Sequence, residues 1–372
     1  MANALAPAPA QAPRVITPAE RAALFGANTR QRIQAEAGVS FTENSTVTIT
    51  LPRVGLTARV FLLVECQYRV THATSAPFTP NRYSPWNLLR RIQLSANNGF
   101  TLHDLSGVGA VLSMLPRLQD LTMLTAVNSV NPDVRGVCVQ SNVSAPSTGA
   151  LNVTRMLVEL PIQINTRDPI GLLMTQADDF TAVLQMEIGN VLSHIIDSAA
   201  GYTTTWVSGT ITPVYESFSV PVLPEAMPDL ATLKLNHESV HPLTGGAETL
   251  IRLQVGVAYR RIILDCRTGA TPHAAMTDGQ ITGISLRANM ADTVYRYNTR
   301  VLENINTLAY SRPMPPGVFV IDLSHQGLPG YGGSRDYIRA QNLTELTLGV
   351  TSSVAGNALV VREMLTRLDT AA

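Results

Sequence analysis

The chain has 372 residues, of which 45% are hydrophobic and 15% charged, and its 27 basic side chains equal its 27 acidic ones in number. This length is enough for two domains or one very large one. The zero net charge gives no general attraction to nucleic acid or anionic lipid, so we expect no sequence-specific binding of nucleic acid. Only one of the 27 basic residues, Lys234, is a lysine.

The three cysteines, Cys66, Cys138 and Cys266, lie far apart in the sequence. They show neither C-x-x-C spacing nor a disulfide framework, so we expect buried free thiols. No apolar run reaches the ~18 residues of a membrane span, and the first fifteen residues lack a signal-peptide core. We expect a soluble product without a cofactor.

The chain begins with an arm, residues 1–15, that is rich in alanine and proline and is expected to be flexible. A helix is predicted to follow directly. Thr17 is its expected N-cap, Pro18 occupies the first helical position, and Glu20 completes a T-x-x-E capping box. We expect this helix to continue until Gly38 ends it. Because it carries few large apolar residues, we expect it to pack against something outside its own domain.

From residue 40 onward, short stretches either alternate apolar and polar residues or run apolar throughout, which predicts β-strands. In the first half of the chain the predicted strands are 46–51, 56–70, 88–95, 151–164, 181–189 and 203–220. Long connections rich in Pro, Gly, Asn and Ser separate them. Helical pattern is limited to short pieces near 104–124 and 167–177.

Residues 221–230, PVLPEAMPDL, contain three prolines and predict an internal boundary. The strands predicted after it are 248–266, 279–288, 292–302, 317–324, 343–350 and 357–365. Two β-rich blocks with long excursions fit an all-β fold of two jelly-roll sandwiches better than a simple meander. We divide the chain into an arm and helix (1–38), a first jelly roll (39–222), a connector (223–247), and a second jelly roll with a C-terminal tail (248–372).

Four segments in this order are similar to those of one family. They are T-P-A-x-x-A-A-L from Thr17, P-x-N-L-x-x-R-I from Pro85, LP…DLATL from Leu223, and P-x-G-V-F-V-I-D from Pro315. In order and spacing they resemble the double jelly-roll major capsid proteins of tailless, internal-membrane bacteriophages, the tectivirus-like lineage. The likeness spans most of the chain, and the loops 127–150 and 267–279 depart from it.

The resemblance implies two jelly rolls in one chain with an N-terminal helical arm. It implies a structural protein rather than an enzyme. As a major capsid protein, the chain would form homotrimeric, pseudo-hexagonal capsomers of an icosahedral shell around an internal membrane. The implied partners are neighbouring capsomers, the internal viral membrane and minor capsid proteins. The implied locations are the virion shell and, during assembly, the host cytoplasm.

The alternative function is a jelly-roll module that binds carbohydrate or a receptor, as a spike does. Such a module should carry clustered exposed aromatic residues with acid or amide partners. Only 5% of the residues here are aromatic, so we favour the capsid protein.

The stretch HESVH, residues 237–241, matches the zinc-protease pattern H-E-x-x-H. On a helix the two histidines share one face and ligate zinc, while the glutamate acts as general base. Pro242 follows directly and disfavours helical geometry at the residue before it, and no third ligand follows at once. We therefore predict that His237, Glu238 and His241 bind no metal and that the stretch is a solvated part of the connector.

One further pair, His103 and Asp104, places an imidazole next to a carboxylate in the sequence. Neighbouring side chains of a strand point to opposite faces. We therefore predict that these two residues form no catalytic pair.

Overall fold

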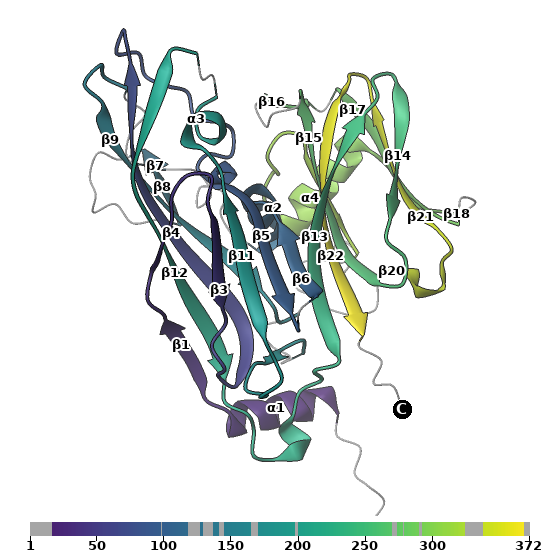
Figure 1. Ribbon diagram of the computed structural model, residues 1–372. Helices are drawn as coiled ribbons and strands as arrows, with labels where there is room; N and C mark the ends of the chain where they lie inside the picture. Colours follow the sequence, from purple (N-terminus) through teal and green to yellow (C-terminus); the bar gives the residue numbers. More distant parts are fainter. Residues whose placement is uncertain are drawn as a thin grey trace, which may run out of the picture.

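The computed structural model describes residues 17–97, 99–117, 127–128, 137–140, 145–164, 170–197, 200–269, 274–277, 279–289, 292–323 and 338–367. The predicted arm, residues 1–15, lies outside them. In the described part of the chain two β-sandwiches stand side by side, and one sheet runs through both (Figure 1).

The first sandwich consists of two facing sheets. One contains β1 (Gln31–Ala35), β2 (Val39–Ser40), β4 (Leu56–His72), β7 (Val127–Asn128), β8 (Cys138–Gln140), β9 (Ala150–Pro161), β10 (Leu173–Met174) and β12 (Tyr202–Phe218). The other contains β3 (Thr46–Thr50), β5 (Leu89–Ala96), β6 (Phe100–Leu105) and β11 (Ala182–Ile188). Strand β4 alternates buried with half-buried residues, because its apolar side chains face the core between the sheets.

The second sandwich has the same plan. One side contains β13 (Thr232–Leu243), β15 (Ala258–Thr268), β16 (Ala274–Ala275), β19 (Val318–Asp322), β20 (Ile338–Arg339) and β22 (Gly356–Arg367). The opposite sheet has the order β14 (Ala247–Leu253), β21 (Leu346–Ser352), β17 (Ile281–Ala288) and β18 (Asp292–Asn298).

The two sandwiches are joined by backbone pairing between β13 and β6. These strands run parallel, with Asn236 opposite His103 and His237 opposite Asp104. As a result one ten-stranded sheet extends from β3 in the first sandwich to β16 in the second. One hydrophobic core cluster likewise includes buried residues of both sandwiches, so the two halves pack as one unit.

Four α-helices and four 3₁₀ turns fall within the described residues. They are α1 (Pro18–Asn28), α2 (Gly107–Met114), α3 (Val191–His194), α4 (Thr299–Tyr310), η1 (Trp86–Leu88), η2 (Leu115–Arg117), η4 (Pro224–Ala226) and η5 (Ala340–Asn342). All eight residues of α2 are buried, and the helix contacts β5 and β9 of the first sandwich and β22 of the second. It therefore lies where the sandwiches meet.

Helix α1 begins as predicted and ends earlier than predicted. The Thr17 hydroxyl accepts a hydrogen bond from the Glu20 N–H at 3.2 Å, and the Glu20 carboxylate accepts one from the Thr17 N–H at 3.0 Å. The helix stops at Asn28, and the chain then forms β1, which pairs with β12. Residues 31–35 favour a helix by propensity, but pairing with a long strand overrides that preference.

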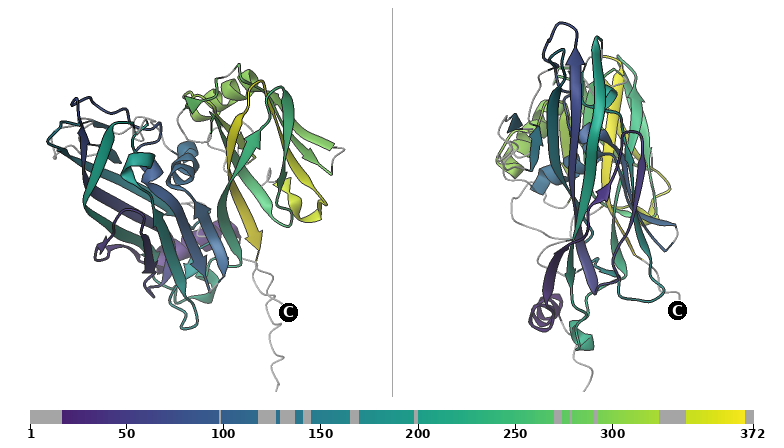
Figure 2. Two further views of the ribbon diagram at one scale, coloured as in Figure 1. Left: turned by 45° about the horizontal axis from the view of Figure 1, so that its top comes forward. Right: turned by 60° about the vertical axis from the view of Figure 1, so that its left-hand side comes forward.

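Helix α1 packs against the base of its own sandwich, next to η4 (Figure 2). Phe25 is buried with Leu56, Ala58 and Leu172 in a small cluster that is separate from the main core. The expectation that the helix packs outside its own domain is therefore only partly right. One aromatic side chain anchors it, and its other apolar residues are half-buried or exposed.

Three further predictions are corrected by the structure. The predicted strand 248–266 is two strands, β14 and β15, separated by a turn in which Gly256 adopts a φ of +86°. Helix α4 begins at Thr299, inside the predicted strand 292–302. The described part of the predicted helix 167–177 contains the short strand β10 and no helix.

The three cysteines are buried and free, as predicted. Burial raises the pKa of each thiol to about 12, so the thiols are neutral and unreactive at neutral pH.

Candidate functional site

The HESVH stretch lies within β13, which corrects its assignment to a solvated connector. Side chains alternate along a strand, so His237 and His241 share one face and Glu238 points to the other. Four strand residues span about 13 Å, whereas the ligands of one zinc ion lie about 2 Å from it. In the described part of the chain no group of three His, Cys, Asp or Glu side chains could hold a metal ion. The stretch thus lacks the geometry on which the H-E-x-x-H mechanism depends.

Glu238 instead reaches the N-terminus of α2. The hydroxyl of Ser106 donates to the Glu238 Oε2 at 2.9 Å and accepts from the Gly109 N–H at 3.1 Å. Burial raises the pKa of Glu238, and its hydrogen bonds with Ser106 oppose that rise. A Cβ at Gly109 would overlap the Glu238 carboxylate, so glycine leaves the room for this contact. A side chain of the second sandwich is thereby attached to a helix that follows β6 of the first.

The histidines near this junction are not arranged for acid–base chemistry. His237 Nε2 lies 3.1 Å from the Thr101 carbonyl oxygen. His103 is fully buried, and within the described residues neither of its ring nitrogens has a hydrogen-bond partner. Burial, together with the nearby charge of Lys234, lowers the pKa of His103 to about 3. Asp104 forms an ion pair with Arg91 at 2.7 Å, so His103 and Asp104 do not act as a pair.

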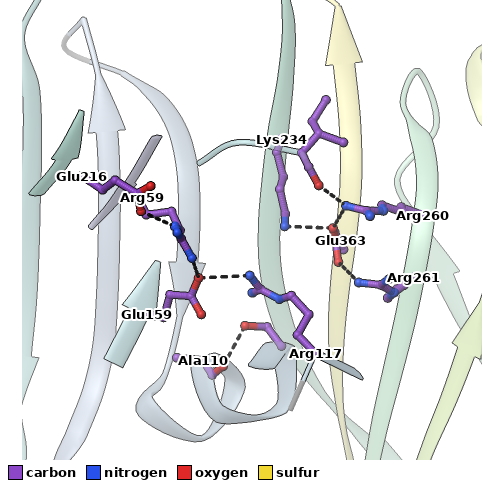
Figure 3. A network of polar contacts seen from close by, with 11 residues as sticks. Arg59, Ala110, Arg117, Glu159, Glu216, Lys234, Arg260, Arg261 and Glu363 are labelled. Carbon is purple, nitrogen blue, oxygen red and sulfur yellow. Dashed lines mark hydrogen bonds and ion pairs between the residues drawn. The ribbon is translucent and has the colours of Figure 1, made fainter. Parts of the chain in front are cut away.

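A network of buried charges lies beside this junction (Figure 3). The only lysine, Lys234 on β13, is 3% exposed, and its Nζ lies 2.9 Å from the Oε1 of Glu363 on β22. The carboxylate of Glu363, 6% exposed, also pairs with Arg260 at 2.8 Å and with Arg261 at 3.3 Å. Arg261 in turn pairs with Asp322 at 2.9 Å. One buried carboxylate therefore holds three cations.

The surroundings shift the pKa values of both members of the central pair. Burial, opposed by the charge of Glu363 and helped by those of Arg117 and Arg260, lowers the pKa of Lys234 to about 7. Burial alone would raise the pKa of Glu363, but the charges of Lys234, Arg260 and Arg261 outweigh it and hold the pKa well below its usual range. Glu363 is therefore ionised at neutral pH, and Lys234 loses its proton far more readily than an exposed lysine.

A second set of ion pairs occupies the first sandwich. Arg59 pairs with Glu216 and, at 3.6 Å, with Glu159. Arg117, directly after α2, pairs with the same Glu159 at 3.3 Å and lies between the two networks in Figure 3. All these carboxylates are held by arginines or the lysine. The arrangement is suited to fixing the position of one sandwich against the other.

Sequence reasoning missed this network, although one signal for it was present. Arg260, Arg261 and Glu363 interrupt strand stretches that are otherwise apolar, AYRRIILDC and VVREML. Charged residues in such stretches are almost never fully buried unless they are paired. The pairing register that brings them together is a long-range property of the fold.

Two of the hollows on the described surface are of similar size. One, of about 400 Å³, lies on the four-stranded sheet of the second sandwich, where the Glu248 carboxylate is bound by Arg287 at 2.6 Å. The other, of about 420 Å³, lies at the base of the first sandwich between β1, the end of β12 and the loop before β4. The first hollow contains its own ion pair; the second contains two arginines and no acidic residue.

Exposed apolar residues occur near the base. Ile33 on β1 is 66% exposed, and Val222, just before η4, is 90% exposed. All five residues of β1 are exposed, although its backbone is paired with β12. This part of the molecule therefore presents side chains and one strand edge to its surroundings.

The fold matches that of several solved capsid proteins. The match to the STIV MCP covers 91% of this chain and 97% of that protein, with a TM-score of 0.66 and 14% sequence identity. The match to the Faustovirus major capsid protein covers 91% of this chain and 90% of that protein, with a TM-score of 0.59 and 10% sequence identity. The match to the major capsid protein P2 from Bacteriophage PM2 covers 92% of this chain and 99% of that protein, with a TM-score of 0.54 and 12% sequence identity. No protein-family model and no curated protein sequence matches the chain.

At such low identity these likenesses establish the fold. The chain has the double jelly-roll fold of viral major capsid proteins over nearly its whole described length. The predicted all-β fold of two jelly rolls is thus confirmed, as is the resemblance to that family of folds.

Proposed function

We propose that this chain is the major capsid protein of a tectivirus-like virus, and that three copies form a pseudo-hexagonal capsomer of an icosahedral shell around an internal membrane. The observation that carries the proposal is the fusion of two jelly rolls into one unit by a continuous sheet. Two similar sandwiches per copy give three copies a nearly six-fold outline, which tiles a shell with a single gene product.

The buried junction supports this role because a tile must keep its shape. Pairing of β13 with β6, the contact of Glu238 with α2, and the hydrogen bond from the Arg260 guanidinium to the Ile164 carbonyl oxygen at 2.7 Å all hold one sandwich against the other. Neighbouring capsomers, minor capsid proteins and the internal viral membrane are the proposed partners. The proposed locations are the virion shell and, before assembly, the host cytoplasm.

The base supplies a surface that suits these partners. Helix α1 is held by Phe25, β1 is exposed along its length, and Val222 projects into solvent. A small number of anchoring contacts allows a segment to adopt different arrangements at different positions of a shell. We therefore assign α1 and β1 to contacts between capsomers or with the membrane, and no catalytic role to any residue of the chain.

Deletion of residues 1–37 tests this assignment. The truncated chain loses α1 and β1 and keeps both sandwiches and their junction, so it should still form folded trimers while its assembly into shells is impaired. Electron microscopy of assembled particles, together with light scattering of the free protein, measures the two effects separately. Normal shells built by the truncated chain would overturn the assembly role, and failure to form trimers would place α1 and β1 in the trimer itself.

One observation favours the carbohydrate- or receptor-binding alternative. The hollow on the second sandwich combines Tyr297, whose ring stacks on Tyr295 at 5.9 Å, with Glu248 and Asn298. Aromatic rings with acid and amide partners are the features that such a module needs. A glycan array with the natural chain and the Tyr297→Ala variant decides it: binding lost in the variant would support this function, and no binding by the natural chain would remove it.

A further inference from the structure

The hollow at the base is formed by four segments that are distant in sequence. In the register of β1 with β12, Arg32 lies opposite Ser217, so the two side chains are on the same face of the sheet. The loop before β4 contributes Arg53, and Gln176 completes the polar lining. The lining also includes Val54, Phe218 and Val220, which give the hollow an apolar part.

The local backbone holds Arg53 in place. Gly55 has a φ of +51°, and a Cβ there would overlap the carbonyl oxygen of Phe218. Only glycine allows the loop to approach the end of β12 so closely in this conformation. The Gly55 carbonyl also accepts a hydrogen bond from the Gln176 N–H at 3.2 Å. The loop is thus fixed against β12, and Arg53 is held at the rim of the hollow.

The opposite wall belongs to the α1–β1 segment. The Ser219 hydroxyl accepts a hydrogen bond from the Arg30 N–H at 2.9 Å, directly before β1. The ring of Phe25 meets that of Phe218 edge to face, with centroids 5.2 Å apart. Arg32 and Arg53 therefore come from two parts of the molecule that these contacts hold together.

No acidic residue in the described part of the chain neutralises the charge of the hollow. Within the described residues neither Arg32 nor Arg53 forms an ion pair or a side-chain hydrogen bond, and both are exposed. No carboxylate lines the hollow. The adjacent acid on β12, Glu216, points to the other face of the strand, where Arg59 and Gln31 bind it. The hollow on the second sandwich differs, since Glu248 neutralises Arg287 there.

We propose that the base hollow binds a phosphate group, with Arg32 and Arg53 as its two cationic partners and Ser217 and Gln176 as hydrogen-bond donors. Guanidinium groups match the paired oxygens of phosphate, and charge-assisted hydrogen bonds are stronger than neutral ones. The volume of about 420 Å³ leaves room for the group that carries the phosphate, and the apolar part of the lining suits a phosphate ester. The same chemistry is offered by a phospholipid headgroup and by free phosphate.

Bound phosphate would connect β1 to the loop before β4, and so attach the α1–β1 segment more firmly to the first sandwich. The site does not depend on the capsid assignment, because it rests only on the residues of one chain. Loss of phosphate binding and loss of trimer formation are separate outcomes.

The test is calorimetric titration of the full chain with inorganic phosphate at low ionic strength. Arg32→Gln and Arg53→Gln are each expected to weaken binding by about 10- to 100-fold, the effect of one charge-assisted hydrogen-bonding partner. Arg300→Gln is the matched control, since it removes an exposed arginine of the second sandwich, and it should leave the affinity unchanged. Both positions of the hollow are exposed, so the variants should remain folded, which circular dichroism checks.

A second arm distinguishes the two sources of phosphate. Vesicles of phosphatidylcholine with and without phosphatidic acid are sedimented with the natural chain and with the double variant Arg32→Gln/Arg53→Gln. Binding only to phosphatidic acid, lost in the double variant, identifies a lipid headgroup; saturable binding of inorganic phosphate without vesicle binding identifies the free ion. The proposal is overturned if the natural chain binds neither inorganic phosphate nor phosphatidic acid saturably, or if Arg300→Gln weakens binding as much as the two variants of the hollow.

Discussion

The junction between the sandwiches and the α1–β1 segment at the base are both places where parts of the chain are joined, and they are built in opposite ways. At the junction a ten-stranded sheet is continuous, and Lys234, Arg261 and Glu363 are almost completely buried. At the base, β1 is paired through its backbone while all its side chains are exposed, and Phe25 anchors α1 in a small separate cluster.

The difference shows which geometry the chain fixes and which it leaves adjustable. Buried charges tolerate only one arrangement, because each displaced partner leaves another charge without compensation. A segment held by edge pairing and one aromatic ring opens at a much smaller cost in free energy. The angle between the sandwiches is therefore fixed in the monomer, whereas the base can respond to neighbours or ligands.

The largest expected effect is at the junction. Glu363→Ala leaves Lys234, Arg260 and Arg261 buried without their shared carboxylate, and should lower the free energy of unfolding by about 3–5 kcal/mol. The matched control is Glu187→Ala, which removes a partly exposed carboxylate 3.9 Å from Arg91 and should cost less than about 1 kcal/mol. Urea denaturation measures both. Equal losses in the two variants would show that the buried network has no special role.

The next effect is a dependence on pH. The pKa of Lys234 is about 7 in the folded protein and near 10.5 in an unfolded chain. Between these values the unfolded chain binds the proton and the folded protein does not. The stability of the natural chain should therefore rise with pH relative to Lys234→Met, by roughly 1 kcal/mol per pH unit. Denaturation of both proteins at pH 7.5, 8.5 and 9.5 tests this, and a constant difference would mean that the lysine keeps its usual pKa.

At the base, even the removal of a large buried side chain should have only a local effect. Phe25→Ala removes the anchor of α1, so hydrogen exchange in Pro18–Asn28 should accelerate while the strands of both sandwiches keep their protection. Leu24→Ala, at a half-buried position of the same helix, is the control and should change exchange far less. If Phe25→Ala lowers protection throughout the molecule, α1 belongs to the core and the contrast between the two regions fails.

The smallest losses of stability are expected for substitutions in HESVH, where the loss should depend on what each side chain contacts. Glu238→Ala removes the partner of the Ser106 hydroxyl and should cost about 1–2 kcal/mol. His241→Ala should be nearly neutral, because within the described residues its ring forms one hydrogen bond, with the hydroxyl of Ser239 two residues away. Neither variant should change the zinc content of the purified protein. Stoichiometric zinc that disappears in both variants would restore the metal-site interpretation.

Strand positions were largely predictable, and the exceptions have a common cause. Alternation of apolar and polar residues located β3, β4, β11 and β12 within one or two residues, because burial on one face of a sheet imposes that period. The C-terminal end of α1 and the strand β13 were missed, because both depend on pairing with residues far along the chain, β12 and β22. A local pattern contains no information about such partners.

The candidate site was predictable only in part. Pro242 correctly argued against a helix at HESVH, yet the same local reasoning placed the stretch in solvent, since its polar residues look like those of a linker. The capping box of Thr17 and Glu20 was found because all its hydrogen bonds are made within four residues. The network of Lys234 and Glu363 was not found, because 129 positions separate the two residues in the sequence.

The mass of the native protein in solution tests the central claim most directly. Each chain is 40.0 kDa, so a homotrimeric capsomer has three times that mass, and light scattering should give this value without a significant population of dimers. The value should persist on dilution and for the Lys234→Met variant, whose substitution lies inside one chain. A species of 40.0 kDa across a wide range of concentrations, in the absence of denaturant, would contradict the proposal that this double jelly roll forms trimeric capsomers.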